Sequence, residues 1–297
     1  MSNEVEPVDL PYGLPSVDYT EYSNRQLLVV PLGVLALALT ILVVWSTMVT
    51  ASGAPVALGT DFTGGTDMKI QTDASKSEVE STFPAAESVA GVAGEADSYV
   101  LTFPPSEDVG EIESTAQDAG YEVQYVQSRS AAFGQESQVQ ALAGVLIAFA
   151  GMSIVVFLLF RTFVPSVAVV ASAFSDIVIP LAAMNLLGMK LSLGTVAALL
   201  MLIGYSVDSD LLLNNHILRR RGAFYESAYR AMRTGVTMTL TSISALIVMT
   251  LVASFFRIPL MPAIGTVLII GLAADLMNTY MLNMSLLRWY KYEGVTR

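Results

Sequence analysis

Long apolar runs dominate the pattern of this sequence and predict six membrane-spanning helices. The first run covers residues 27–48, and the others cover residues 139–160, 164–187, 191–213, 235–256 and 262–287. Each run is close to the roughly 20 residues that a helix needs to cross a bilayer. The later runs are joined by short connections, except for an arginine-rich one at 214–234. We therefore expect a helix at 27–49 and a five-helix bundle within 135–297.

The first apolar run has a secretory signal peptide as its competing interpretation, because small residues follow it at 51–54. Two features argue against a signal. The run is longer than the apolar region of a signal peptide, and the tail at 1–26 is acidic rather than basic, with Glu4, Glu6 and Asp9. An uncleaved membrane anchor is the prediction.

The distribution of basic residues predicts the orientation in the membrane. Six spans put both termini on one side, and that side is expected to be the cytoplasm because lysine and arginine accumulate there. This choice places on the inside Arg25, Arg161, Arg219, Arg220, Arg221, Arg230, Arg233, Arg288, Lys291 and Arg297. The short outer loops keep only Lys190 and Arg257.

The segment 50–134 is then one extracytoplasmic domain between the first two spans. Its pattern predicts strands at 66–71, 89–92, 99–103 and 121–126, a turn at 94–97, and helices at 75–83 and 107–119. Ser75 with Glu78 forms a capping box at one helix start, and Gly120 ends the other helix. The order β-α-β-β-α-β is the ferredoxin-like arrangement. The fold class is thus an α-helical membrane protein with six transmembrane helices and an extracytoplasmic α+β ferredoxin-like domain.

Composition restricts the function. Of 297 residues, 54% are hydrophobic and 14% are charged, cysteine is absent, and the mean hydropathy is +0.59. These values argue against a soluble enzyme and exclude a disulfide scaffold or a zinc ribbon. The net charge of −11 argues against a nucleic-acid partner. Residues 50–134 hold fourteen acids and three bases, so this domain alone accounts for the whole charge.

Four acids lie inside apolar spans, where a charge costs several kcal/mol, and are therefore functional candidates. Asp176, Asp208 and Asp275 are about 18, 16 and 20 Å from the cytoplasmic side at 1.5 Å per residue, which is nearly one level. The fourth acid, Asp210, is about 200° around the helix from Asp208, so the two cannot share a face. Asp210 does share a face with Asn214, four residues on.

The fifth span carries a polar stripe at helical spacing, made of Arg233, Thr237, Thr241 and Ser244. The stripe could line a wet path to the carboxylates, or its hydroxyls could simply bond their own helix backbone. A buried carboxyl near an arginine could load and release a proton, and carboxylates with hydroxyl oxygens could equally hold sodium. The sequence does not distinguish between a proton and a sodium ion.

Other motifs point to no enzyme. Asp208-Ser209-Asp210 has the spacing of a metal-binding motif but lies in an apolar helix, and we expect no metal centre there. Asp208 and Asp275 could be the pair of an intramembrane aspartyl protease, although the Gly-x-Gly-Asp element of those enzymes is missing. His216 is expected to be an interface residue. No phosphate loop, Ser-His-Asp set or glycine-rich dinucleotide turn is present, so neither catalysis nor a cofactor is predicted.

Three motifs together resemble the SecF family of protein-export membrane proteins. They are Asp61-Phe62-Thr63-Gly64-Gly65-Thr66, Gly204-Tyr205-Ser206-Val207-Asp208, and Arg233-Thr234 followed by Thr237. The six-span layout with a large loop after the first span is similar as well. The resemblance covers nearly the whole chain, and the three motifs are specific only in combination.

The chain also departs from the bacterial pattern of this family. Asp208-Ser209 stands where the family commonly has Asn-Asp, and Ser175-Asp176 stands where it has His-Asp. Asp208 instead matches the fourth-span acid of the partner family SecD. We therefore favour Asp208 as the ion carrier, with Asp210 as the second candidate. The variant resembles archaeal members, and the acidic outer domain is typical of a halophile.

The resemblance implies an auxiliary subunit of the Sec export machinery in the plasma membrane. Such a subunit pairs with SecD, associates with the SecY translocon and assists the exported polypeptide. The family resembles the RND transporters, in which membrane acids use an ion gradient to move outer domains. On that view Thr63, Gly64 and Gly65 form a hinge or turn. Half of an RND-type small-molecule exporter remains the alternative from the same superfamily.

Overall fold

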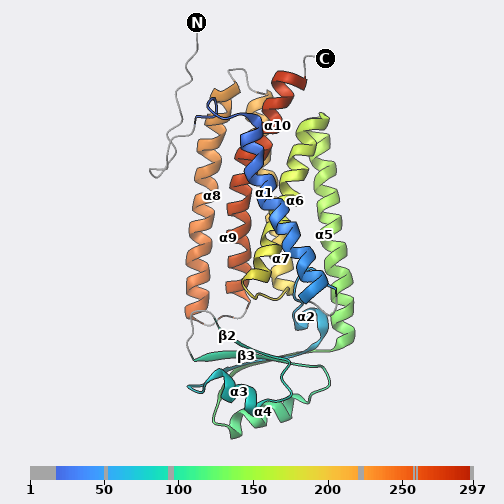
Figure 1. Cartoon of the computed structure of the whole chain (residues 1–297), viewed down its shortest axis with the longest axis vertical. Coiled ribbons are helices and arrows are strands. Elements are labelled where there is room, and N and C mark those ends of the chain that lie inside the picture. Colours follow the sequence, from blue (N-terminus) through green and yellow to red (C-terminus); the bar gives the residue numbers. More distant parts are fainter. Residues whose placement is uncertain are drawn as a thin grey trace. The chain divides into compact units, whose positions relative to one another are not determined.

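The computed structural model describes residues 18–49, 53–92, 97–219, 224–256, 258 and 260–294, and six long apolar helices run through that part of the chain (Figure 1). Five of them are α1 (Asn24–Val44), α5 (Ala131–Phe160), α6 (Phe163–Leu186), α7 (Leu193–Arg219) and α8 (Phe224–Phe255). The sixth is composite and consists of α9 (Met261–Met277), the π-helical η3 (Asn278–Asn283), α10 (Met284–Trp289) and η4 (Tyr290–Gly294). Likewise α1 continues into a π-helical turn, η2 (Trp45–Val49). The six predicted long apolar helices are confirmed.

The helix boundaries differ from the expected ones where helices have polar ends. α5 begins at Ala131 rather than at residue 139, and α8 begins at Phe224 rather than at residue 235. Most of the predicted arginine-rich connection at 214–234 is therefore helical, and its middle, 220–223, lies outside the described residues. The hydropathy pattern marks only the apolar part of a helix, whereas alanine, methionine and arginine continue the helix equally well.

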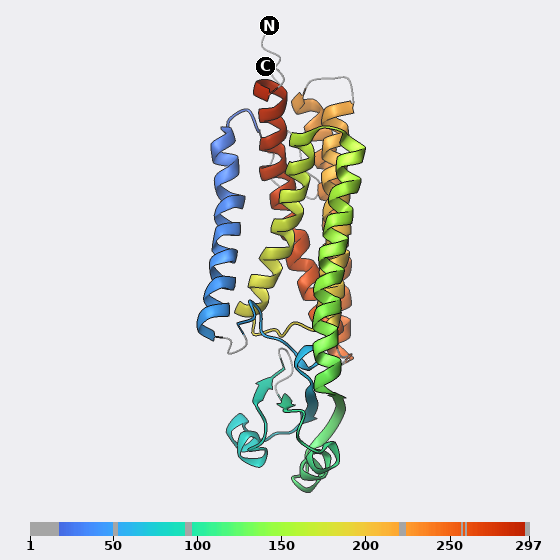
Figure 2. The ribbon, with the colours of Figure 1, turned by 90° about the vertical axis from the view of Figure 1, so that its right-hand side faces the viewer.

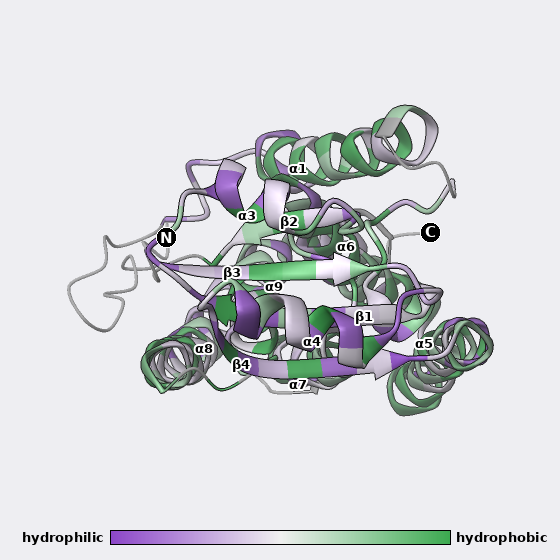
Figure 3. Cartoon of the chain, turned by 90° about the horizontal axis from the view of Figure 1, so that it is seen from below, coloured by the Kyte–Doolittle hydropathy of each residue, from purple (hydrophilic) through white to green (hydrophobic). Residues whose placement is uncertain are grey.

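The helices fall into an inner and an outer set. In the apolar windows of α6 and α7, 61% and 50% of residues are buried, compared with 6% for α5 and 17% for α8. Figure 3 agrees, because α1, α5 and α8 lie at the periphery of the helical group. The inner helices α6, α7 and α9 carry the four membrane acids, of which Asp176, Asp210 and Asp275 are buried and Asp208 is exposed.

Residues just before α1 are fixed to the last helices. Tyr19 is buried, and its hydroxyl donates to the carbonyl oxygen of Tyr280 at 2.7 Å. Arg288 donates to the carbonyl oxygens of Tyr19 and Tyr22. Ser23 and Gln26 form a capping box at the start of α1. Within the predicted tail at 1–26, the residues just before α1 are thus bonded to the last helices, and residues 1–17 lie outside the described part.

A second compact unit comprises Leu58–Gly144 and Lys190–Leu193. Its elements are α2 (Thr60–Thr63), β1 (Gly65–Gln71), α3 (Lys76–Thr82), β2 (Ser88–Gly91), β3 (Ser98–Phe103), α4 (Val109–Asp118) and β4 (Glu122–Arg129). The four strands form one antiparallel sheet in the order β2-β3-β1-β4. The predicted order of strands and helices is present, while most of the turn expected at 94–97 lies outside the described residues.

The helices α3 and α4 pack on one face of this sheet (Figure 1 and Figure 2). Met68 and Ile70 alternate along β1 and are fully buried against Val79 of α3 and Ile112 of α4. Both helices begin at polar caps: Ser75, as predicted, accepts from the Glu78 N–H at the start of α3, and Asp108 caps α4. Gly120 has a φ of +76° just after α4, as expected of a glycine that ends a helix.

Candidate functional site

Three carboxylates meet inside the membrane bundle. Asp176 comes from α6, Asp210 from α7 and Asp275 from α9, and none of the three side chains is more than 1% exposed. Each lies on one of the inner helices, which bury the largest share of their apolar windows. A group of acids this deeply buried requires hydrogen-bond donors or positive charge around it.

Asp176 has donors for both of its oxygens. Ser206 Oγ donates to Oδ2 at 2.6 Å, and Asn278 Nδ2 donates to Oδ1 at 2.6 Å. Pro180 lies four residues later in α6 and has no N–H to donate to the main-chain carbonyl of Asp176. The carboxylate of Asp176 therefore belongs to a part of α6 where the main-chain hydrogen bonds of the helix are interrupted.

Thr279 joins the other two acids. Its hydroxyl lies 2.8 Å from Asp210 Oδ1 and 3.2 Å from Asp275 Oδ1. Asn283 Nδ2 also donates to Asp210 Oδ1, at 2.8 Å. Thr279 and Asn283 belong to η3, a π-helical stretch, and π-helical turns are frequent at functional sites.

Several buried oxygens of this cluster have no hydrogen-bond partner. They are Asp210 Oδ2, Asp275 Oδ2, Asn278 Oδ1, Asn283 Oδ1, Asn214 Oδ1, Ser172 Oγ and Ser175 Oγ. The Ser172 hydroxyl nevertheless lies near Asp210, and the Ser209 hydroxyl lies near Asp275. No ion pair reaches the three carboxylates within the described residues. No set of three or more histidine, cysteine, aspartate or glutamate side chains in that part of the chain is arranged to hold a metal ion.

α7 has two polar faces, and they separate the two acids that the sequence places near each other. Ser206, Asp210 and Asn214 are spaced by four residues and are buried. On the opposite face Tyr205 and Asp208 are exposed. Of the three acids expected at nearly one depth, Asp176 and Asp275 are buried but Asp208 is exposed, and Asp210 is the α7 acid that lies beside Asp275. The physical reason is the rotation of about 200° between the two positions.

The polar stripe on α8 faces outward in this chain. Arg233, Thr241 and Ser244 are exposed, and Thr237 is half-buried. The hydroxyls of Thr237, Thr241 and Ser244 each donate to a carbonyl oxygen four residues earlier. This is the backbone bonding that the sequence analysis kept as an alternative, and Arg233 does not contact the buried acids.

The structure does not bring together the protease pair considered from the sequence. Asp275 is fully buried beside Thr279, whereas Asp208 is exposed on the outer face of α7. Two catalytic aspartates must share one substrate site. Asp208 and Asp275 do not meet this requirement.

Sequence reasoning missed the polar residues of the last span. Asn278, Thr279 and Asn283 follow Asp275 by three, four and eight residues, which places them on one helical face. That spacing was readable in the sequence, because polar residues are rare in such an apolar run. Ser206, four residues before Asp210, carries the same signal.

The motif at 61–66, which follows the first span, forms a closely packed turn in the second unit. Asp61 Oδ2 accepts a hydrogen bond from the Leu193 N–H at 3.0 Å, and Asp61 Oδ1 lies 3.6 Å from Arg129 Nε. Gly64 and Gly65 have φ values of +75° and +110°, so the predicted turn at Thr63, Gly64 and Gly65 is present. A Cβ on Gly65 would lie 2.3 Å from the Phe103 carbonyl oxygen. Such close packing favours a rigid turn over a freely moving hinge.

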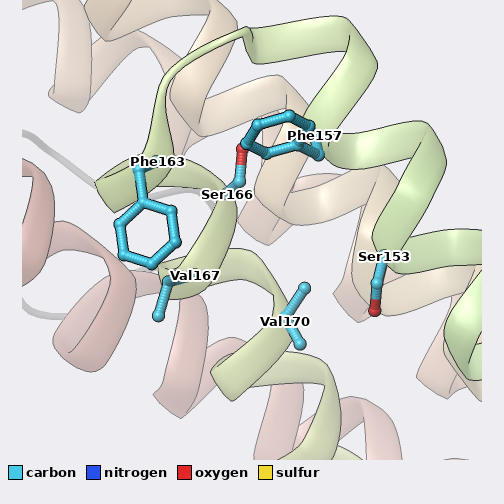
Figure 4. Close-up of a pocket in the computed structure, with 6 residues that line it drawn as sticks. All are labelled: Ser153, Phe157, Phe163, Ser166, Val167 and Val170. Carbon is cyan, nitrogen blue, oxygen red and sulfur yellow. The ribbon is translucent and has the colours of Figure 1, made fainter.

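An apolar groove of about 170 Å³ lies between α5 and α6 (Figure 4). It is lined by Ser153, Phe157, Phe163, Ser166, Val167 and Val170. The two serine hydroxyls donate to carbonyl oxygens of their own helices. None of the four membrane acids lines the groove, so it is not part of the candidate site.

Comparison with known proteins links this architecture to protein export. Residues 111–293 match the family model described as protein export membrane protein SecD/SecF, C-terminal. The chain is 62% identical to the protein-export membrane protein SecF of Haloferax volcanii over 96% of this chain and 99% of that protein. The SecF of Haloquadratum walsbyi is 56% identical with the same coverage, and that of Methanocaldococcus jannaschii is 37% identical over 86% of this chain and 94% of that protein.

Solved structures share the fold. The crystal structure of SecDF, a translocon-associated membrane protein from Thermus thermophilus, superposes with a TM-score of 0.72 at 18% identity. A second structure, SecDF in a super-membrane-facing form, gives a TM-score of 0.59 at 19% identity. The matches cover 93% and 96% of this chain but only 39% and 41% of the SecDF chains, which are therefore much longer than this one.

Proposed function

This chain belongs to the SecF family of protein-export membrane proteins, and we propose that it works together with SecD as an auxiliary subunit of the Sec export machinery. Family membership and six apolar helices make it a multi-pass membrane protein. In the proposal, the subunit uses the transmembrane ion gradient to assist the translocation of polypeptides through the SecY channel.

The exposed face of α7 is the observation that carries this proposal. Met201, Gly204, Tyr205 and Asp208 follow each other at helical spacing and are exposed in the single chain. A carboxylate in the centre of a lipid-facing helix costs about 2.5–3.5 kcal/mol. A second membrane protein that covers this face would remove the cost, and a small residue such as Gly204 allows close helix contact. SecD is the partner that family membership suggests.

Ion coupling is assigned to the polar residues of the spans. The proposed relay comprises Asp208, Asp210, Asp176, Asp275, Arg233, Thr237 and Thr241. Asp208 and Arg233 lie on exposed surfaces, where a partner can reach them, and the other three acids form the buried cluster. Since carboxylates inside a membrane are costly, their presence on three inner helices supports a role beyond packing.

The proposed orientation places both termini in the cytoplasm and residues 50–134 outside the cell. Arginine and lysine are in excess on the side of the membrane that holds the termini, and such an excess is typical of the cytoplasmic side. For the outer domain we propose the ferredoxin-like class, which the order of its elements and the strand order β2-β3-β1-β4 support. The exposed acids of this domain would then face the external medium.

Co-purification tests the partnership. The tagged full chain, extracted in mild detergent, should recover SecD in a fixed ratio, and a Tyr205→Cys variant should form a disulfide with a cysteine placed in a SecD span. A Leu186→Cys variant at the exposed end of α6 is the matched control. Recovery of a lone subunit, or equal cross-linking of both variants, contradicts the proposed interface.

Export assays test the coupling. Asp208→Asn should slow the release of exported proteins in cells while leaving the recovery of SecD unchanged. Unchanged export would remove Asp208 from the mechanism. If the variant instead alters the efflux of a small molecule and leaves export intact, the exporter alternative is favoured.

A further inference from the structure

We infer that the apolar groove between α5 and α6 binds an anionic membrane phospholipid, with one hydrocarbon chain in the groove and the phosphate at Arg161. Arg161 and Thr162 are the whole connection between α5 and α6, so the arginine lies at the end of the two helices that form the groove. Lipid binding does not depend on the ion coupling or the partner proposed above, and it can be measured on the purified chain alone.

The groove has nearly the depth of one membrane leaflet. It begins beside the helix connection, at Phe157 and Phe163, and ends at Ser153 on α5 and Val170 on α6 (Figure 4). Ser153 and Val170 are eight and nine residues from Arg161 in the sequence, so the groove extends about 12–14 Å from the connection. The hydrocarbon core of one leaflet is about 15 Å thick. A lipid whose headgroup lies at the connection can therefore fill the groove with its chain.

The lining of the groove favours hydrocarbon over a polar ligand. The hydroxyls of Ser153 and Ser166 donate to carbonyl oxygens of their own helices at 2.8 and 2.7 Å, so neither requires a partner in the groove. The volume of about 170 Å³ is close to that of an apolar cavity of ~150 Å³ that stays dry and binds benzene. A turn of helix is about 10 Å wide and needs more space than this. A single hydrocarbon chain is the occupant that fits.

The groove is open toward the lipid and closed at its deep end. Phe163 and Val167 on the α6 wall are 73% and 46% exposed. One helical turn beyond the deep end, the rings of Phe149 and Phe174 pack edge to face with their centroids 6.5 Å apart. The two helices thus touch deeper in the membrane and leave the groove between them toward Arg161, so a chain can enter from the side.

Arg161 supplies the charge that favours an anionic headgroup. It is the only charged residue between Glu136 and Asp176 in the sequence, and its side chain is exposed. Arg161 forms no ion pair within the described residues. Basic residues at the end of a membrane helix attract anionic headgroups, and a guanidinium can bind a phosphate with two parallel hydrogen bonds.

The backbone conformation of Arg161 supports a role for its side chain. Its φ of +53° is the left-handed position after the end of α5, where glycine is the usual residue. A side chain is disfavoured in this conformation, so glycine would suit the fold better than arginine does. We therefore expect Arg161→Gly to remove the charge while the chain remains folded.

Lipid binding to the purified full chain in detergent tests the headgroup site. Dioleoylphosphatidylglycerol should bind at one saturable site, counted by native mass spectrometry, and should raise the melting temperature more than dioleoylphosphatidylcholine does. Arg161→Gly should weaken the binding of phosphatidylglycerol about fivefold and remove the preference for it, because one arginine near a membrane surface contributes about that factor. Arg161→Lys, which keeps the charge, should retain most of the preference. Arg230→Gln, which removes an exposed arginine on α8, is the matched control.

A second pair of variants tests the groove. Ser153→Phe fills the groove without changing the charge and should weaken the binding of both lipids. Leu158→Phe places the same ring at an exposed position of α5 that does not line the groove, and it should bind both lipids as the original chain does. Melting in lipid-free detergent shows whether each variant is folded.

Three results would overturn the proposed lipid site. Equal binding of the two lipids to the original chain, or equal losses in Arg161→Gly and Arg230→Gln, would exclude Arg161 as the headgroup site. Unchanged lipid binding in a folded Ser153→Phe variant would exclude the groove as the place of the chain. Displacement of phosphatidylglycerol by millimolar inorganic phosphate would show that the site binds an anion without the hydrocarbon chain.

Discussion

The carboxylate of Asp61 accepts a hydrogen bond from the main-chain N–H of Leu193 at 3.0 Å. Leu193 is the first residue of α7, so Asp61 satisfies one of the N–H groups that a helix start leaves unpaired. Near it, Gly59 N–H donates to the Leu191 carbonyl oxygen at 2.8 Å. The short segment at 190–193 is thereby fixed to the residues that precede β1, although about 130 positions separate them in the chain.

Asp61→Ala should release this segment. Loss of a capping carboxylate costs about 1 kcal/mol, and the nearby Arg129 also loses its anion. Hydrogen–deuterium exchange at Leu193 should become faster, with little change in β1. Asp118→Ala removes an exposed acid from the same unit and is the control. Equal protection of Leu193 in Asp61→Ala and Asp118→Ala would contradict the capping role.

Gly65→Ala should destabilise the second unit. The φ of +110° disfavours a side chain, and the new Cβ would lie 2.3 Å from the Phe103 carbonyl oxygen, a main-chain atom of the paired strand β3. The backbone strain alone costs about 1–2 kcal/mol, and the overlap adds to it. Limited proteolysis of the folded chain should cut this unit sooner.

The matched control for Gly65→Ala is Gly91→Ala on β2. No atom lies within 4 Å of a Cβ built on Gly91, and β2 is at the edge of the sheet. This variant should resist proteolysis as the original chain does. If both variants are equally resistant to proteolysis, the close packing around Gly65 does not stabilise the second unit.

Alkaline pH should destabilise the sheet through Tyr125. Burial, and then the charge of Asp67, raise the pKa of the Tyr125 phenol above its ordinary value of 10. The folded state therefore favours the neutral phenol, so its contribution is complete below pH 10 and is lost as the pH rises through the raised pKa. Tyr125→Phe should flatten the fall of the melting temperature above pH 10. An identical fall in both proteins would exclude this tyrosine as its cause.

The helices of this protein were predictable because a membrane span needs about 20 apolar residues, and that length is visible in any single sequence. The strands β1 and β4 were equally visible from alternation, since one face of the sheet packs on α3 and α4. The start of α8 at Phe224 was not predictable, because the polar end of a helix gives no hydropathy signal.

The inward acid of α7 was harder to predict. Asp208 and Asp210 have the same chemistry, and which one is buried depends on how α7 is rotated against α6 and α9. The local clue was the spacing of Ser206, Asp210 and Asn214, which puts three polar groups on one face. Resemblance to a motif drew attention to Asp208 instead. The partners on η3 depend on contacts more than 60 positions away in the chain, such as Thr279 with Asp210.

Leucine substitutions at these two acids should have different effects on the stability of the purified subunit. Asp210→Leu leaves the buried amide of Asn283 without its acceptor, which costs about 1–3 kcal/mol, whereas Thr279 can still donate to Asp275. Asp208→Leu replaces an exposed carboxylate on an apolar helix and should leave the melting temperature in detergent unchanged or slightly higher. Because Asp208 is proposed to act in the assembled complex, Asp208→Leu should nevertheless slow export in cells. A lower melting temperature for Asp208→Leu than for Asp210→Leu would show that the two faces of α7 have been assigned the wrong way round.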